Sequence, residues 1–142
     1  MKTTFSIVFI EDNPFYLKSF YKRIERQIAQ MEHYWDCRFT TDAFTDSSRF
    51  LKRVNDGADL AFIDYNLGMG LTAPLLMAFM QTLDQVPRTV IFSENNITDE
   101  DMDGFAEHVE AILRKDDMII PRSCVLIEQC LIQKHEYLNK DI

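Results

Sequence analysis

The chain has 142 residues, of which 46% are apolar and 12% aromatic, so it is long enough for one domain with a substantial core. Its net charge of −8 argues against a broad nucleic-acid contact, which needs a basic face. It has no apolar window of membrane-spanning length and no signal-peptide pattern, and its three cysteines lack zinc spacing and fit reduced thiols. We therefore expect a cytoplasmic domain that contacts neither nucleic acid directly nor a membrane.

The first half of the chain predicts two strand–helix pairs. A short apolar run indicates the first strand, and Asn13 followed by Pro14 is typical of a helix start. Polar and apolar residues then alternate, as in a half-exposed edge strand. The expected elements are a strand at residues 5–10, a helix over 14–31, a strand at 37–42, and a helix that begins within 45–48 and ends within 55–57.

The second half of the chain predicts three more pairs. Residues 59–63 form an apolar run too short for a helix, as expected of a strand buried on both faces of a parallel sheet. Five alternations of strand and helix predict an α/β fold with a right-handed, doubly wound parallel sheet and five helices. The later elements are a helix capped by Thr72 with apolar residues up to Leu83, a strand at 89–92, a short helix from about Thr98 interrupted by Gly104, a strand at 109–113, and a helix from Pro121 to about Tyr137.

Side chains capable of chemistry follow four of the predicted strands. The carboxyl ends of parallel strands meet at one edge of a sheet, where open α/β folds bind ligands. Three carboxylates at that edge would repel one another unless a cation lay among them, and Mg²⁺ with oxygen ligands fits best. A hydroxyl and an ammonium beside such an ion could hold a phosphoryl group. The residues are Glu11, Asp12, Asp64, Ser93 and Lys115.

This set of residues, in this order on these strands, resembles the receiver domain (CheY-like) of bacterial response regulators in two-component signalling systems. The resemblance covers nearly the whole chain. It implies a flavodoxin-like fold with a five-stranded sheet of order 2-1-3-4-5. It also implies a single receiver domain over residues 1–142, with a core at about 4–138. No output domain is expected within these residues, which fits either a stand-alone receiver or a fragment of a larger regulator.

The resemblance assigns a role to each residue of the set. Asp64 would accept the phosphoryl group from a sensor histidine kinase or a phosphotransfer protein. Glu11, Asp12, Asp64 and the backbone carbonyl of Asn66 would bind Mg²⁺. Ser93 would hydrogen-bond the phosphoryl group, and Lys115 would form an ion pair with it. Such a domain is not an enzyme beyond its self-catalysed phosphoryl transfer and dephosphorylation.

Four positions depart from the receiver pattern. Asp116 follows the lysine where receivers commonly have a cis proline, and Ile112 stands where they usually carry a mobile aromatic residue. Glu94 replaces the small residue after the switch hydroxyl, and Gly68 replaces a frequent proline four residues after the acceptor. None of these changes removes a chemical group of the site, so the departures concern how the state of Asp64 is transmitted.

The partner surface of receivers is formed by the fourth helix, the fifth strand and the fifth helix. Residues 94–113 contain seven acids and no lysine or arginine, which fits either a solvated face or an acidic docking face for a basic protein partner. The last helix is apolar on more than one side, which suggests a partner contact or a homodimer.

Two other functions stay open. One is a receiver-like interaction domain that is never phosphorylated, which the residues Glu94, Ile112 and Asp116 favour. The other is a Mg²⁺-dependent hydrolase with Asp64 as nucleophile, which Asn66 disfavours because such a phosphatase places its acid–base carboxyl there.

Overall fold

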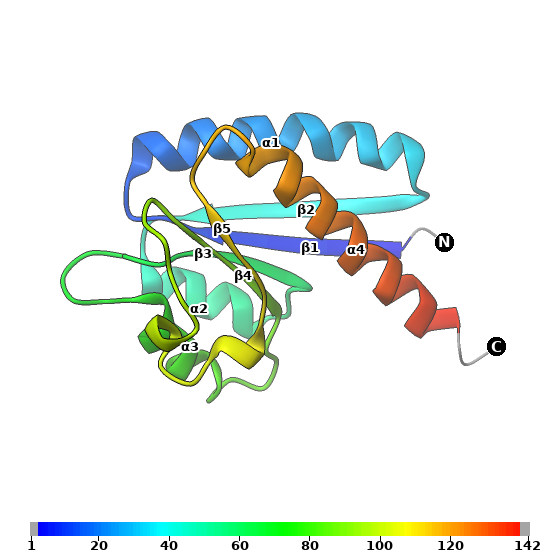
Figure 1. The fold of residues 1–142 in the computed structure, drawn as a ribbon. Coiled ribbons are helices and arrows are strands. Elements are labelled where there is room, and N and C mark those ends of the chain that lie inside the picture. The colour runs from blue at the N-terminus through cyan, green and yellow to red at the C-terminus, as the bar shows by residue number, and fades with distance from the viewer. Residues whose placement is uncertain (1–2, 140–142) are drawn as a thin grey trace.

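The computed structural model describes residues 3–139, which form one five-stranded sheet with helices on both faces (Figure 1). All neighbouring strands are parallel, and their order is β2-β1-β3-β4-β5. The predicted fold class and strand order are therefore confirmed. The strands are β1 (Thr3–Ile10), β2 (Cys37–Phe44), β3 (Leu60–Asp64), β4 (Arg88–Ser93) and β5 (Val109–Arg114).

One face of the sheet is covered by α1 (Pro14–Tyr34) and α4 (Ile119–Asn139) (Figure 1). The α1 helix starts as predicted, because Asn13 Oδ1 accepts hydrogen bonds from the backbone N–H groups of Phe15 and Tyr16. Its apolar residues recur at helical spacing and pack against phenylalanines of β1, β3 and β4. The α4 helix begins two residues before Pro121, which lies in its first turn.

The other face is covered by α2 (Ser47–Asn55) and the short helix α3 (Ala73–Met80). Asp46 caps α2 by accepting a hydrogen bond from the Ser48 N–H. Thr72 occupies the predicted cap position of α3, although its side chain makes no capping hydrogen bond within the described residues. Leu75 and Phe79 lie on the exposed side of α3, whereas Leu76, Met77 and Met80 are buried.

The predicted helix near residues 98–106 is wrong. In its place are two single turns of 3₁₀ helix, η1 (Glu100–Met102) and η2 (Ala106–His108). The capping pattern does form, since Asp101 Oδ2 accepts hydrogen bonds from the Thr98 N–H and hydroxyl. Asp103 and Gly104 then adopt φ values of 50° and 88°, in the left-handed region that ends a helix. The described residues thus contain four α-helices, and the expected partner surface lacks a fourth helix between β4 and β5.

The far end of α4 is attached to the amino-terminal edge of the sheet. Lys134 Nζ lies 3.0 Å from Asp59 Oδ1 and donates a 2.6 Å hydrogen bond to the Thr4 carbonyl. Asp59 Oδ2 in turn accepts a 2.8 Å hydrogen bond from the Ser6 N–H. These contacts join α4 to β1 and to the start of β3. Over the part of the chain that the structure describes, no helix is long and apolar enough to span a membrane.

Candidate functional site

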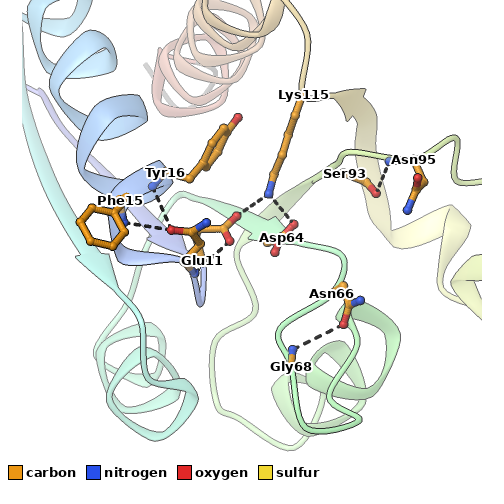
Figure 2. A network of polar contacts seen from close by, with 10 residues as sticks. Glu11, Phe15, Tyr16, Asp64, Asn66, Gly68, Ser93, Asn95 and Lys115 are labelled. Carbon is orange, nitrogen blue, oxygen red and sulfur yellow. Dashed lines mark hydrogen bonds and ion pairs between the residues drawn. The ribbon is translucent and has the colours of Figure 1, made fainter.

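A cleft of about 260 Å³ opens at the carboxyl edge of the sheet. Its walls come from the segments that follow β1, β3, β4 and β5. All six residues predicted from the sequence line this cleft, together with four others. Figure 2 labels Glu11, Tyr16, Asp64, Asn66, Ser93, Asn95 and Lys115 of the lining, and the other lining residues are Asp12, Asn13 and Glu94.

The register of the sheet explains why residues so distant in sequence meet. Ile10 of β1 is paired with Ile63 of β3, so Glu11 and Asp64 both follow directly on paired residues. Ser93 of β4 is paired with Arg114 of β5, which brings Lys115 to the same edge. The backbone N–H of Lys115 also donates a 2.8 Å hydrogen bond to the Ser93 carbonyl.

Three carboxylates gather at the floor of the cleft. Glu11, Asp12 and Asp64 each offer an oxygen, and these oxygens all lie within 4.8 Å of one another. Glu11 and Asp64 are buried, whereas Asp12 is exposed. Burial disfavours a charged carboxylate, and it raises the pKa of Glu11 to about 7 despite the hydrogen bond from Lys115. Burial likewise raises the pKa of Asp64, against the opposing effect of the Lys115 charge.

Lys115 partly compensates this negative charge (Figure 2). Its ammonium donates a 2.6 Å hydrogen bond to Glu11 Oε2 and lies 3.0 Å from Asp64 Oδ1, with only 7% of the side chain exposed. Burial alone would lower the pKa of Lys115, but the hydrogen bond to Glu11 and the charge of Asp64 outweigh it and raise the pKa. Lys115 is therefore a fixed positive charge between two buried carboxylates.

The cleft suits a hard divalent cation. Carboxylate oxygens are the ligands that Mg²⁺ prefers, and one ammonium faces three carboxylates here. Gly68 permits the close approach of the loop after β3, because a Cβ at this position would lie 3.0 Å from Asp12 Oδ2. Asn66, two residues earlier in the same loop, also lines the cleft. Glu11, Asp12 and Asp64 are thus the residues that could hold the ion.

Ser93 and its neighbours form the wall opposite α1. The Ser93 hydroxyl accepts a 3.2 Å hydrogen bond from the Asn95 N–H, which leaves the hydroxyl proton able to donate elsewhere. Glu94 is exposed and lines the cleft beside them. Ile112 of β5 is half-buried and packs with the aliphatic cluster beneath α2 and α3, so this position has no ring to rotate.

Sequence reasoning missed Tyr16 and Asn95 as residues of the cleft. The Lys115 ammonium lies 4.3 Å from the centroid of the Tyr16 ring. The spacing of four residues between Tyr16 and Phe20 could have indicated where Tyr16 lies, because it places both rings on one face of α1. Asn95 carried no such signal, since its place depends on the path of the loop after β4.

No protein-family model matches the sequence, and no curated protein matches it. Solved structures do match. A response regulator receiver domain protein from Clostridium thermocellum is 14% identical, with a TM-score of 0.70 and coverage of 94% of this chain and 98% of the other. A CheY-like receiver domain from Methylobacillus flagellatus is 17% identical, with a TM-score of 0.67 and coverage of 90% and 99%.

The chain has the receiver-domain fold. A third similar structure is the isolated receiver domain of RcsB from Salmonella enterica serovar Typhimurium, solved in the presence of the phosphomimetic BeF₃⁻. It is 14% identical, with a TM-score of 0.65 and coverage of 89% of this chain and 90% of that one. In this receiver fold the cleft lies at the carboxyl edge of the central strands β1 and β3, where doubly wound sheets bind ligands.

Proposed function

We propose that the chain is a receiver of a two-component system, which is phosphorylated on Asp64 and signals to a protein partner. The observation that carries this proposal is the position of Asp64. It is a buried carboxylate whose Oδ1 lies 3.0 Å from the Lys115 ammonium and whose neighbours Glu11 and Asp12 complete an acidic cluster. A carboxylate in this setting can act as a nucleophile toward phosphorus.

The phosphoryl donor in the proposal is a phosphohistidine of a sensor kinase or a phosphotransfer protein. An Asp64 carboxylate oxygen attacks phosphorus, and an O–P bond forms as the N–P bond breaks. The departing imidazole nitrogen keeps the electron pair and takes a proton from water. Mg²⁺ bound by Glu11, Asp12, Asp64 and the Asn66 carbonyl would neutralise charge on the phosphoryl oxygens.

Two side chains would then hold the product. The Lys115 ammonium would exchange its contact with Asp64 Oδ1 for one with a phosphoryl oxygen, since it already lies at that carboxylate. The Ser93 hydroxyl, which accepts its present hydrogen bond from the Asn95 N–H, would donate to a second phosphoryl oxygen. Phosphorylation would favour the conformation in which both contacts form, and so shift the population of states.

The test is phosphorylation of the full chain by acetyl phosphate with Mg²⁺, and binding of BeF₃⁻ in parallel. We expect mass spectrometry to find one phosphoryl group on the wild type and none on Asp64→Asn. Asp36→Asn removes an exposed carboxylate from the turn between α1 and β2, and it should react like the wild type. A wild type that takes up neither phosphoryl group nor BeF₃⁻ would contradict the proposal.

That negative result would favour the alternative of a phosphorylation-independent interaction domain. Two observations give this alternative its weight. Position 112 is aliphatic, and the Glu94 carboxylate lines the cleft through which a donor must approach. Rapid, repeated release of phosphate from phosphoesters would instead indicate the hydrolase, which Asn66 disfavours because it offers no carboxyl two residues after Asp64.

We place the downstream contact on the face formed by η1, β5 and α4. A largely apolar groove of about 390 Å³ runs between β5 and α4, with Met118 and Val125 each at least half exposed beside it. Seven acids lie among residues 94–110, in the segment that runs from the end of β4 into β5. Either a protein partner or a second copy of the chain could use the groove. Sedimentation with and without BeF₃⁻ tests the homodimer, and a monomer under both conditions excludes it.

A further inference from the structure

The Lys115 ammonium is held on two sides by different kinds of contact. The carboxylates of Glu11 and Asp64 lie on one side, at 2.6 and 3.0 Å. Aromatic rings lie on the other: the ammonium is 4.3 Å from the centroid of Tyr16 (Figure 2) and 5.2 Å from that of Phe92. A cation is attracted to the face of an aromatic ring, and this attraction grows when water is excluded.

The Tyr16 ring is itself fixed by the core. It stacks on Phe20 with centroids 6.0 Å apart and an interplanar angle of 13°, and on Phe92 at 6.2 Å and 26°. Phe20 and Phe92 stack on each other at 5.4 Å, and both are almost fully buried. The surface that Lys115 meets is therefore an edge of the hydrophobic core rather than a mobile side chain.

The ring, and not the hydroxyl, makes this contact. Tyr16 Oη is buried and has no hydrogen-bond partner among residues 3–139. Burial raises the pKa of this hydroxyl to about 12, so it carries no charge near neutral pH. Phenylalanine at this position would preserve the contact with Lys115, whereas an aliphatic residue would abolish it.

We propose that Tyr16 is a positioning residue, which holds the Lys115 ammonium at the site of phosphoryl transfer. This inference rests on the proposed function of Asp64. During the transfer Lys115 must change its partner at Asp64, and Glu11 would also serve as a ligand of Mg²⁺. The contact with the ring depends on neither, so it keeps a long and flexible side chain in place throughout the reaction.

The kinetic test compares phosphorylation rates by acetyl phosphate at saturating Mg²⁺. We expect Tyr16→Leu to react about tenfold more slowly and Tyr16→Phe to stay within about twofold of the wild type. Tyr21→Leu is the matched control, because it removes a half-buried ring of the same helix that packs on Phe9 instead. Tyr16→Met is a second aliphatic variant for the case in which Tyr16→Leu fails to fold.

A double variant separates positioning from a general structural effect. If Tyr16 acts through Lys115, Tyr16→Leu should slow the wild type but add nothing in a Lys115→Met background. If Tyr16→Leu lowered the phosphorylation rate by the same factor in both backgrounds, the proposal would be overturned, because the ring would then act on the site without Lys115. An unchanged rate in both Tyr16→Leu and Tyr16→Met would overturn it as well.

An NMR measurement keeps this test distinct from that of the proposed function. In protein with ¹³C-labelled lysine, the Lys115 methylene protons next to the ammonium should be shifted upfield by the ring in the wild type and in Tyr16→Phe. In Tyr16→Leu the shift should fall to the smaller part that the more distant Phe92 ring contributes. If the wild type is not phosphorylated, the function of Asp64 fails, yet this signal still decides whether Tyr16 positions Lys115. Its absence from the wild type would overturn the inference.

Discussion

Gly68 shows how tightly the loop after β3 closes on the acidic cluster. Its φ of +78° lies in the left-handed region, where side chains with a Cβ are strained. In addition, a Cβ would lie 3.0 Å from Asp12 Oδ2, so the carboxylate would have to move. Gly70, two residues later, has the same φ of +78° but nothing within 4 Å of the position of a Cβ. A comparison of alanine substitutions at the two glycines can thus distinguish the effect of backbone strain from the effect of contact with the site.

We predict that Gly70→Ala lowers the free energy of unfolding by about 1 kcal/mol through strain alone, and that Gly68→Ala lowers it by about 2 kcal/mol. Only Gly68→Ala should also weaken Mg²⁺ binding, because it displaces the Asp12 carboxylate. Urea unfolding and titration calorimetry with Mg²⁺ measure the two effects. Equal Mg²⁺ affinities of the two variants would show that the approach of Gly68 to Asp12 has no effect on ion binding.

Residues of the site that lie at strand ends were easier to predict from the sequence than a residue that lies inside a helix. Glu11, Asp64 and Lys115 could be found from sequence because each directly follows an apolar strand, and the geometry of a parallel sheet brings such residues together. Tyr16 lies inside a helix, where an aromatic residue first suggests core packing. Its contact with Lys115 depends on the direction of a lysine side chain, which no local pattern encodes.

Among the elements, the segment between β4 and β5 was predicted least well. The acids and the cap at Thr98 indicated a helix, and the cap indeed forms. Of the residues in η1 and η2, however, only Met102 is buried, and a helix with one anchor gains little from packing. Tertiary contacts hold the segment instead. Met102 packs beneath α3, and the Tyr65 hydroxyl donates a 3.1 Å hydrogen bond to the Asp101 carbonyl.

That hydrogen bond links η1 to the residue that directly follows Asp64. We predict that Tyr65→Phe lowers the free energy of unfolding by about 0.5–1 kcal/mol and increases amide exchange at η1. Tyr34→Phe is the matched control, since Tyr34 is 84% exposed and should change stability little. Urea unfolding and hydrogen exchange measure these effects. Unchanged exchange at η1 in Tyr65→Phe would mean that Met102 alone fixes the segment.

For the whole molecule, the parallel sheet and the two-faced core followed from pattern because the same signal repeats along the chain, whereas the strand order came from the resemblance to receiver domains. Each buried strand is an apolar run, and α1 and α2 each carry an apolar stripe that faces the sheet. The ends of elements shifted by up to three residues, as at Ile119, Tyr34 and Met80, because packing and capping both act there.

The thiols of the half-buried Cys124 and the buried Cys130 make the stability of the molecule fall at alkaline pH. Burial raises the pKa values of Cys124 and Cys130 from 9.0 to about 11. Below pH 9 both folded and unfolded chains hold these protons, so the stabilising contribution is complete. Between about pH 9 and 11 the unfolded chain has released them and the folded chain has not, so the free energy of unfolding falls as pH rises.

We therefore predict that the loss of stability between pH 8 and pH 10 is smaller in a Cys124→Ala, Cys130→Ala variant than in the wild type. The variant will be less stable at pH 8, because alanine leaves a small cavity at the buried Cys130. Only the difference between the two pH values is informative, and urea unfolding at each pH provides it. If the free energy of unfolding falls by the same amount between pH 8 and pH 10 in both proteins, groups other than these two thiols cause the loss of stability.

The attachment of Lys134 to Asp59 and Thr4 has a mechanical consequence for α4. This point lies at the amino-terminal edge of the sheet, whereas the start of α4 lies four residues beyond Lys115 at the other edge. From Ile119 to Lys134 the helix extends about 22 Å at 1.5 Å per residue. Any displacement that begins at the site end turns α4 as a lever about Lys134. Met118 then travels farthest, Val125 about half as far, and Ile132 hardly at all.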